Sequence, residues 1–171
     1  MMMGSHEKPV LFFKHMTHHL LDLDRSFMKD MVNIILTRDP TEMLISFAKV
    51  IEKPCMEDLG YTAHIELLSE FTSMGIQPIV LDSKKLLLNP KGVLEKLCDS
   101  IGISFQEQML RWEAAARKED GVWAKYWYSS VHRSSAFKKY SAPTDPFPEH
   151  LQPLLEKCLP LYRELEKLSI G

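Results

Sequence analysis

The sequence predicts an α/β fold with a small parallel sheet flanked by helices. Two observations favour this class. Val32 to Leu36 is an apolar run rich in β-branched residues, as is typical of a buried parallel strand, and a helix-start pattern follows it directly. A second short run, Ile79 to Leu81, is also followed by a helical pattern. Alternation of strands and helices indicates a parallel sheet covered by helices.

Length and composition set the remaining bounds. A chain of 171 residues with 45% hydrophobic and 26% charged residues is ordinary for one globular domain. A net charge of −2 argues against a nucleic-acid-binding protein, which is usually basic. Three widely spaced cysteines favour a reducing, cytoplasmic compartment. We expect neither a membrane span, which needs about 18 apolar residues, nor a signal peptide.

The N-terminal region predicts a strand–helix–strand unit. Residues 1–8 read as a disordered N-terminus or a remnant of cloning. Pro9 to His15 is a short apolar run that we expect to form a second parallel strand, with Lys14 and His15 at its carboxyl end, where ligands collect in open α/β sheets. Leu20 to Met31 has the apolar spacing of a short helix.

The strongest helix start follows the Val32 strand. Asp39 is an expected N-cap, Pro40 occupies the first helical position, and Glu42 completes a capping-box pattern. The apolar stripe then continues to Ile51. This pattern predicts an amphipathic helix that begins where the strand ends.

An arginine at this strand–helix join predicts an anion site. Arg38 provides a planar, permanently charged guanidinium beside the amide donors of a helix N-terminus. Ser46, at the border of the apolar stripe, is expected to face the same site. The alternative is a purely structural role, in which Arg38 pairs with Asp39 or a neighbouring carboxylate.

The remaining elements complete an α/β core over residues 9–140, a linker over 141–148 and a C-terminal packing helix within 149–171. Glycines, prolines and apolar periodicity set their boundaries. We expect helices at Glu57–Met74, ending at Gly75, from Asn89-Pro90 to Gly102, and at Glu149–Leu168, kinked at Pro160, with an amphipathic piece over Phe105–Trp112.

The composition changes between Arg117 and Phe137. This segment holds two tryptophans, two tyrosines, five basic side chains and one glycine. Aromatic rings mixed with cations suit a flat ring and its phosphates. The alternative is an aromatic cluster that pins a long loop onto the core.

The histidines at His15, His18 and His19 do not predict a metal site, because no further ligand lies near them in sequence. A catalytic role for His15 at a strand end is the better functional hypothesis, since a neutral imidazole can accept a proton near pH 7. For His18 and His19 the simpler interpretation is exposure at a helix start.

Taken together, these segments resemble the P-loop sulfotransferases, which transfer a sulfuryl group from 3′-phosphoadenosine 5′-phosphosulfate (PAPS). NIILTRDPTEMLISF is similar to the family's strand-to-helix element, whose arginine and a serine eight residues later hold the cofactor's 3′-phosphate. The resemblance assigns these roles to Arg38 and Ser46. FFKHM is similar to the family's strand end that carries the catalytic base, which implies His15 as the base and Lys14 beside the transferring group.

A third match lies in RKEDGVWAK, which resembles the family's loop over the 3′-phosphate and implies Arg117, Lys118, Gly121 and Trp123. The loop is one residue shorter before its glycine than in the family, and Glu119 replaces a glycine. The sequence of this segment, DGVWAKYWYSSVHRSSAF, is more similar to a divergent plant-type group, some of whose members are named after branched-chain aminotransferases.

The resemblance implies a three-layer, P-loop NTPase-like fold that is N-terminally truncated, because no Gly-Lys-Ser/Thr loop for the 5′-phosphosulfate occurs in the sequence. We therefore expect a protein that retains the 3′-phosphate half of a site for PAPS or adenosine 3′,5′-bisphosphate and is weakly active or inactive alone. The acceptor stays unknown. Two alternatives remain: a non-catalytic fragment that self-associates through an exposed apolar surface, and a kinase-like nucleotide enzyme.

Overall fold

The computed structural model describes residues 9–17, 20, 23–118, 120–122 and 124–171. The expected N-terminal segment 1–8, together with His18, His19, Glu119 and Trp123, lies outside the described residues. The elements in chain order are η2 (Ser26–Asp30), β1 (Ile34–Thr37), α1 (Pro40–Phe47), α2 (Met56–Leu59), α3 (Tyr61–Ser73), β2 (Ile79–Asp82), α4 (Ser83–Leu88), α5 (Pro90–Ile101), η3 (Glu107–Leu110), α6 (Ala124–Trp127), α7 (Ser129–His132), η4 (Glu149–Leu151), α8 (Gln152–Leu168) and β3 (Ser169–Ile170).

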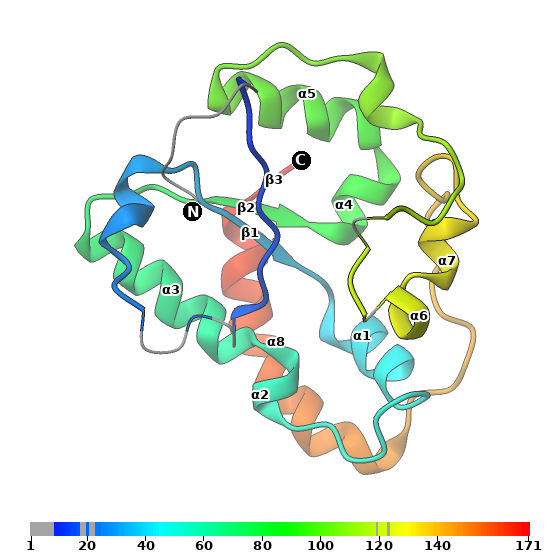
Figure 1. The fold of residues 1–171 in the computed structure, drawn as a ribbon. Coiled ribbons are helices and arrows are strands. Elements are labelled where there is room, and N and C mark those ends of the chain that lie inside the picture. The colour runs from blue at the N-terminus through cyan, green and yellow to red at the C-terminus, as the bar shows by residue number, and fades with distance from the viewer. Residues whose placement is uncertain (1–8, 18–19, 21–22, 119, 123) are drawn as a thin grey trace.

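The sheet described by the structure has three parallel strands in the order β1-β2-β3 (Figure 1). Thr37 is the register partner of Asp82, so β1 and β2 end side by side. Val80 of β2 pairs with Ser169 of β3. The predicted α/β class, with a small parallel sheet flanked by helices, is confirmed, and it is consistent with a P-loop-like fold.

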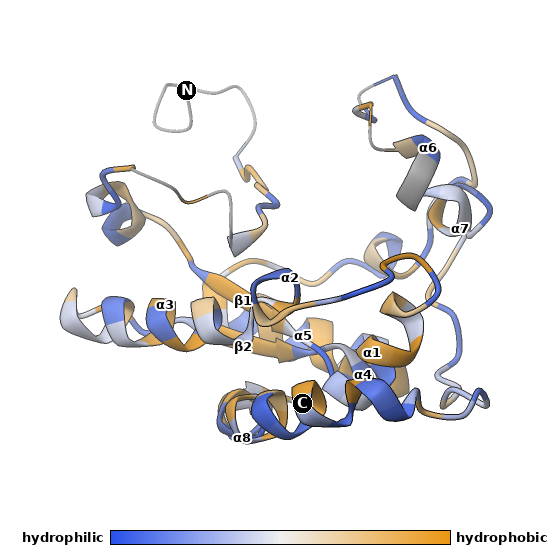
Figure 2. Ribbon diagram, turned by 90° about the horizontal axis from the view of Figure 1, so that it is seen from below, coloured by the Kyte–Doolittle hydropathy of each residue, from blue (hydrophilic) through white to orange (hydrophobic). Residues whose placement is uncertain are grey.

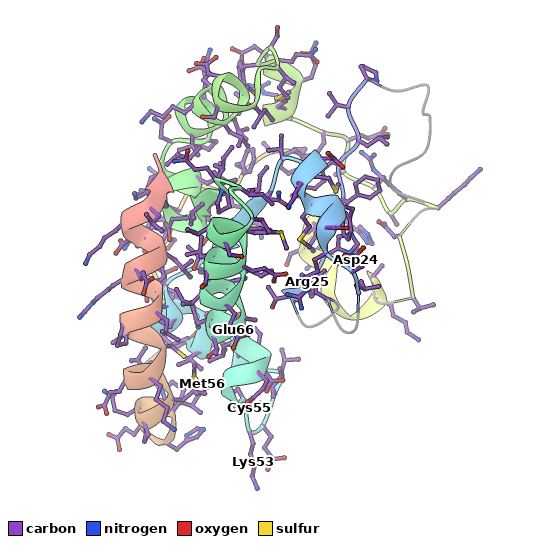
Figure 3. The ribbon with its side chains drawn as sticks, turned by 90° about the vertical axis from the view of Figure 1, so that its left-hand side faces the viewer. Asp24, Arg25, Lys53, Cys55, Met56 and Glu66 are labelled. Carbon is purple, nitrogen blue, oxygen red and sulfur yellow. The ribbon has the colours of Figure 1, made fainter. Side chains whose placement is uncertain are left out.

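Helix α8 covers one face of this sheet. It packs on β1, β2, α1 and α3, whereas the N-terminal segment and helices α6 and α7 lie on the opposite side (Figure 2). Arg25 lies just before η2 (Figure 3). It pairs with Glu70 and thereby fastens this part of the chain to α3. The two faces of the sheet therefore differ in how closely they are covered.

The hydrophobic core lies between the sheet, α3 and α8. Leu44 of α1 and Leu165 of α8 are completely buried, and burial of one such side chain stabilises the fold by about 1.5–3 kcal/mol. The cluster of buried residues consists of Met28, Ile35, Leu44, Leu59, Tyr61, Leu67, Phe71, Val80, Leu151, Leu155, Cys158, Tyr162 and Leu165.

Strand β1 differs from the expected fully buried strand. Ile35 and Thr37 are buried, but Leu36 on the other face is 57% exposed. Only the face toward α8 is closed, because side chains alternate between the two faces of a strand. In the described part of the chain, the second edge of β1 has no pairing strand.

The expected strand at Pro9–His15 is wrong. The segment has an apolar composition but forms no ladder, and its side chains from Val10 to Phe13 are exposed, with Phe12 at 80%. High β-propensity alone is insufficient, because a strand needs a paired neighbour to satisfy its backbone. Downstream, the expected helix at Leu20–Met31 is reduced to the 3₁₀ turn η2.

Three expected helices also differ from the structure. The helix after Asp39 ends at Phe47, short of Ile51. The Glu57–Met74 helix is divided in two by Gly60, whose φ of 75° is left-handed and therefore interrupts the helical path. The Phe105–Trp112 piece contains only the short η3. Helix α5 matches the prediction, with Asn89 as N-cap and Gly102 after its end.

No helix in the described part of the chain is both long enough and apolar enough to span a bilayer.

Candidate functional site

The candidate site lies where β1 and β2 end. Because Thr37 and Asp82 are register partners, the residues that follow them, Arg38 and Ser83-Lys84, leave the sheet from adjacent positions. The carboxyl edge of a parallel sheet is the usual location of ligands in open α/β folds. Two cationic side chains, Arg38 and Lys84, thus start from this edge.

The start of α1 has the predicted N-cap and proline but not the predicted capping box. Asp39 is the N-cap, and its Oδ1 accepts a hydrogen bond from the backbone N–H of Thr41 at 2.8 Å, while Pro40 occupies the first helical turn. The expected capping role of Glu42 is replaced by other contacts. Its carboxylate lies 3.7 Å from Nη2 of Arg38 and accepts a hydrogen bond from the hydroxyl of Tyr140.

A hydrogen bond holds the backbone of Arg38, whereas its side chain is exposed to solvent. The hydroxyl of the buried Tyr61 donates a hydrogen bond to the carbonyl oxygen of Arg38 at 2.5 Å. Burial raises the pKa of Tyr61 far above its usual value, so the hydroxyl remains a donor. The Arg38 side chain is 42% exposed. Its pairing with Glu42 agrees with the structural alternative in which Arg38 meets a neighbouring carboxylate.

Ser46 is exposed on α1. It follows Glu42 by four residues, so the two side chains share one face of the helix. Glu42 in turn contacts Arg38. This geometry places Ser46 one turn beyond the Arg38–Glu42 pair, on the same side.

The structure places Lys14 and His15 on the exposed N-terminal segment. The Nζ of Lys14 lies 5.8 Å from the ring centroid of Tyr128. The ring of His15 stacks on Phe13, with centroids 6.5 Å apart and an interplanar angle of 15°. The segment therefore contacts the aromatic region near α7, and the structure brings Lys14, rather than His15, toward it.

The segment after Arg117 is organised by an aspartate. Asp120 Oδ2 accepts a hydrogen bond from the backbone N–H of Arg117 at 2.9 Å and lies 2.8 Å from Nε2 of His132. The hydrogen bond from Arg117 is the main reason why the pKa of Asp120 is lowered. The edge of the Tyr128 ring meets the His132 ring, with centroids 6.0 Å apart.

The predicted loop residues in this segment are open to solvent. Arg117, Lys118 and Gly121 are exposed, and Gly121 has open space around the position that a Cβ would take. A cleft of about 240 Å³ adjoins the loop, with Trp112, Glu113, Ala115, Arg117, Asp120, Val131 and His132 in its walls.

A larger cleft lies elsewhere. It has about 530 Å³ and is walled by Leu23, Asp24, Arg25, Ser26, Lys29, Glu70 and Met74, between η2 and the end of α3. One of its two cations is already engaged, since Arg25 pairs with Glu70 and donates to the carbonyl oxygen of Leu20 at 2.8 Å. The chemistry of the strand ends is therefore the better candidate.

Sequence reasoning missed Lys84, Tyr140, Asp120 and His132. For Lys84 a signal was present in the sequence. Arg38 is the first residue after its strand and Lys84 is the second residue after β2, so both cations follow the end of a strand. Tyr140 and Glu42 are 98 residues apart, so no local pattern joins them. The Asp120–His132 contact likewise depends on the path of the loop.

Comparison with known proteins provides independent evidence. A family model described as a sulfotransferase domain matches residues 2–168. Two curated relatives from Arabidopsis thaliana are similar over 163 residues, or 95% of the chain: branched-chain-amino-acid aminotransferase-like protein 2 at 37% identity and protein 1 at 38%. The chain spans 29% of the length of each relative. No solved structure matches.

Proposed function

Because the chain belongs to the sulfotransferase-domain family, we propose that it binds the 3′-phosphate of PAPS or adenosine 3′,5′-bisphosphate where β1 and β2 end. The observation that carries this proposal is the position of Arg38, anchored through its backbone to Tyr61 with its guanidinium open beside the start of α1. A guanidinium fork binds phosphate oxygens in a bidentate manner. Ser46, on the same helix face as Glu42, would add a hydroxyl donor.

The other predicted residues have roles in this proposal too. Arg117, Lys118 and Gly121 are exposed next to the Asp120–His132 pair, and with Trp123 they would cover the nucleotide. PAPS would supply the sulfuryl group. His15 would accept the proton of an acceptor hydroxyl, and Lys14 would lie beside the transferring group; both side chains are exposed on the N-terminal segment.

We propose weak or no activity for these 171 residues alone. They contain no Gly-Lys-Ser or Gly-Lys-Thr step to hold a 5′-phosphosulfate, and loss of a single charge-stabilising donor already lowers kcat by about a hundredfold or more. The three cysteines are free thiols, which is compatible with the proposed cytoplasmic location.

The test is binding of adenosine 3′,5′-bisphosphate, measured by thermal unfolding and by calorimetry. A ligand at a hundred times its Kd stabilises a protein by about 2.7 kcal/mol, and we expect a corresponding rise in Tm. Arg38→Ala should abolish this rise. Arg163→Ala, which removes an exposed arginine on α8, is the matched control and should retain it. An unchanged Tm at millimolar ligand would contradict the proposal.

A second candidate function is self-association without catalysis, and the open edge and face of β1 favour it. Leu36 is 57% exposed on that face, and apolar residues of the N-terminal segment are exposed on the same side of the sheet (Figure 2). Exposed apolar patches often mark interaction sites. Sedimentation velocity should reveal concentration-dependent association that Leu36→Lys weakens. A monomer at every concentration would exclude this function.

A further inference from the structure

The carboxylate of Glu42 lies in the middle of the proposed phosphate site. Its Oε2 is 3.7 Å from Nη2 of Arg38, and its Oε1 accepts a hydrogen bond from the Tyr140 hydroxyl. The Glu42 side chain is only 12% exposed, whereas that of Arg38 is 42% exposed. An internal anion therefore occupies the inner side of the site, with the arginine toward solvent.

Lys84 lies beside the tyrosine that binds this carboxylate. Its Nζ lies 5.3 Å from the ring centroid of Tyr140. The pKa of Lys84 is raised, chiefly by hydrogen bonding with Tyr140 and also by the negative charges of Glu42 and Asp39. Two donors from distant parts of the chain, Arg38 at the end of β1 and Tyr140 beyond α7, thus contact one acidic side chain, and Lys84 at the end of β2 lies against Tyr140.

These donors are of the types that bind phosphate. A guanidinium, an ammonium and a phenol hydroxyl all donate to phosphate oxygens, and the first two also supply positive charge. In the structure, the positive charges of Arg38 and Lys84 are balanced by the negative charges of Glu42 and Asp39. Asp39 is committed to the helix cap through Thr41, so Glu42 is the carboxylate that an incoming phosphate would meet and repel.

We propose that Glu42 stands in for the ligand's phosphate, and that Arg38, Lys84 and Tyr140 bind the phosphate once the Glu42 side chain turns away. This inference rests on the proposed function for the identity of the ligand, a 3′-phosphate monoester. It adds Lys84 and Tyr140 as binding residues and makes Glu42 a competitor that weakens binding. The pair with Arg38 is long and partly exposed, so it is readily exchanged for a stronger anion.

The experiment compares Kd values of the full chain for two probes, adenosine 3′,5′-bisphosphate and inorganic phosphate, by calorimetry. Glu42→Gln keeps the shape of the side chain and an acceptor for Tyr140 but removes the charge. We expect it to tighten binding of both probes by about tenfold, since a like charge next to the phosphate is lost. Glu66→Gln, at an exposed position on α3, is the matched control and should leave both Kd values unchanged (Figure 3).

Two further variants test the donors. In the Glu42→Gln background, Lys84→Met and Tyr140→Phe should each weaken phosphate binding again, while Lys29→Met, on the exposed surface of η2, should not. Thermal unfolding of every variant establishes that it is folded. Glu42→Gln has the least structural risk, because the substitution is isosteric.

The outcomes separate this inference from the proposed function. An unchanged or weaker affinity in Glu42→Gln would overturn the role of Glu42, even if the bisphosphate binds the wild type through Arg38. A gain for inorganic phosphate without preference for the bisphosphate would support the role of Glu42 and contradict the nucleotide function. Absence of binding to either probe in every variant would overturn both.

Discussion

The hydroxyl of Tyr162 on α8 donates a hydrogen bond to Oδ2 of Asp82, at the end of β2, over 2.9 Å. Both residues are buried. The other oxygen of Asp82 accepts the backbone N–H groups of Lys84 and Lys85, each at 2.9 Å, and so caps α4. One buried carboxylate therefore joins the sheet, the C-terminal helix and the element that presents Lys84 to the candidate site.

Tyr162→Phe should destabilise the protein by about 1–3 kcal/mol, because it leaves a buried carboxylate oxygen without its donor. The free energy of unfolding in urea measures the loss. Tyr140→Phe is the control, since it removes a hydroxyl from a partly exposed position and should cost less. Equal stability of Tyr162→Phe and the wild type would show that the bond contributes nothing net.

His64 on α3 should make stability depend on pH. Its Nδ1 is buried and has no hydrogen-bond partner among the described residues, and burial lowers its pKa below the ordinary 6.5. Below pH 6.5 the imidazole of the unfolded chain binds a proton, whereas the buried imidazole of the folded chain stays neutral down to a lower pH. The free energy of unfolding therefore falls as the medium becomes more acidic. Urea midpoints between pH 7.5 and pH 5.5 should fall less in His64→Leu than in the wild type. His150→Leu, at an exposed site, should retain the wild-type trend.

Cys55 should become more reactive when its acidic partner is removed. Its Sγ donates to Oδ2 of Asp58 at 3.1 Å at the start of α2 (Figure 3), and this bond is the main reason why the pKa of Cys55 is raised. Asp58→Asn should lower that pKa and increase the alkylation rate at pH 7.5, because the thiolate is the nucleophile. Mass spectrometry after iodoacetamide treatment measures the rate.

Two comparisons make the thiol experiment decisive. Glu52→Gln changes an exposed carboxylate away from the thiol and should leave the rate unchanged. Cys158 is buried, which raises its pKa to about 11, so it should resist alkylation in the folded protein. A slower reaction of Cys55 in Asp58→Asn would refute the assignment.

Asp120→Ala should loosen the loop that follows Arg117. The carboxylate binds the Arg117 N–H and His132, and the Arg117 amide should lose its protection from hydrogen exchange in the variant. Because the pKa of Asp120 is lowered from 3.8, the protection in the wild type should persist near pH 4 and disappear as the pH falls through the lowered pKa. Asp99→Ala, on the exposed side of α5, should have no effect on this amide.

The local elements of the fold could be predicted because their signals are local. Asp39 with Pro40 and Asn89 with Pro90 begin helices in both sequence and structure, since each aspartate or asparagine caps the turn next to it. Gly60 shows the limit of this reasoning. The apolar stripe continues past it, and only its left-handed conformation reveals that α2 and α3 are separate.

The non-local features could not be predicted. Two segments behave differently from what their composition suggests. The apolar run Pro9–His15 pairs with no strand, whereas the short segment Ser169–Ile170 joins the sheet. Tertiary pairing overrides strand propensity in both cases. At the site, Arg38 and Ser46 share a local pattern, but Tyr140 reaches Glu42, and Lys84 reaches Tyr140, only through the folding of the whole chain.

The pairing of β2 with β3 has a consequence for the order of folding. Helices α4 to α8 all lie between the two strands in the chain, so this pairing closes a long loop and contributes strongly to contact order, which slows folding. During synthesis, β1, α3 and β2 emerge before α8 and β3 exist. Until then Val80 and Leu81 have an open strand edge, and unpaired edges invite aggregation. Nascent intermediates of this protein are therefore expected to be the clients of chaperones.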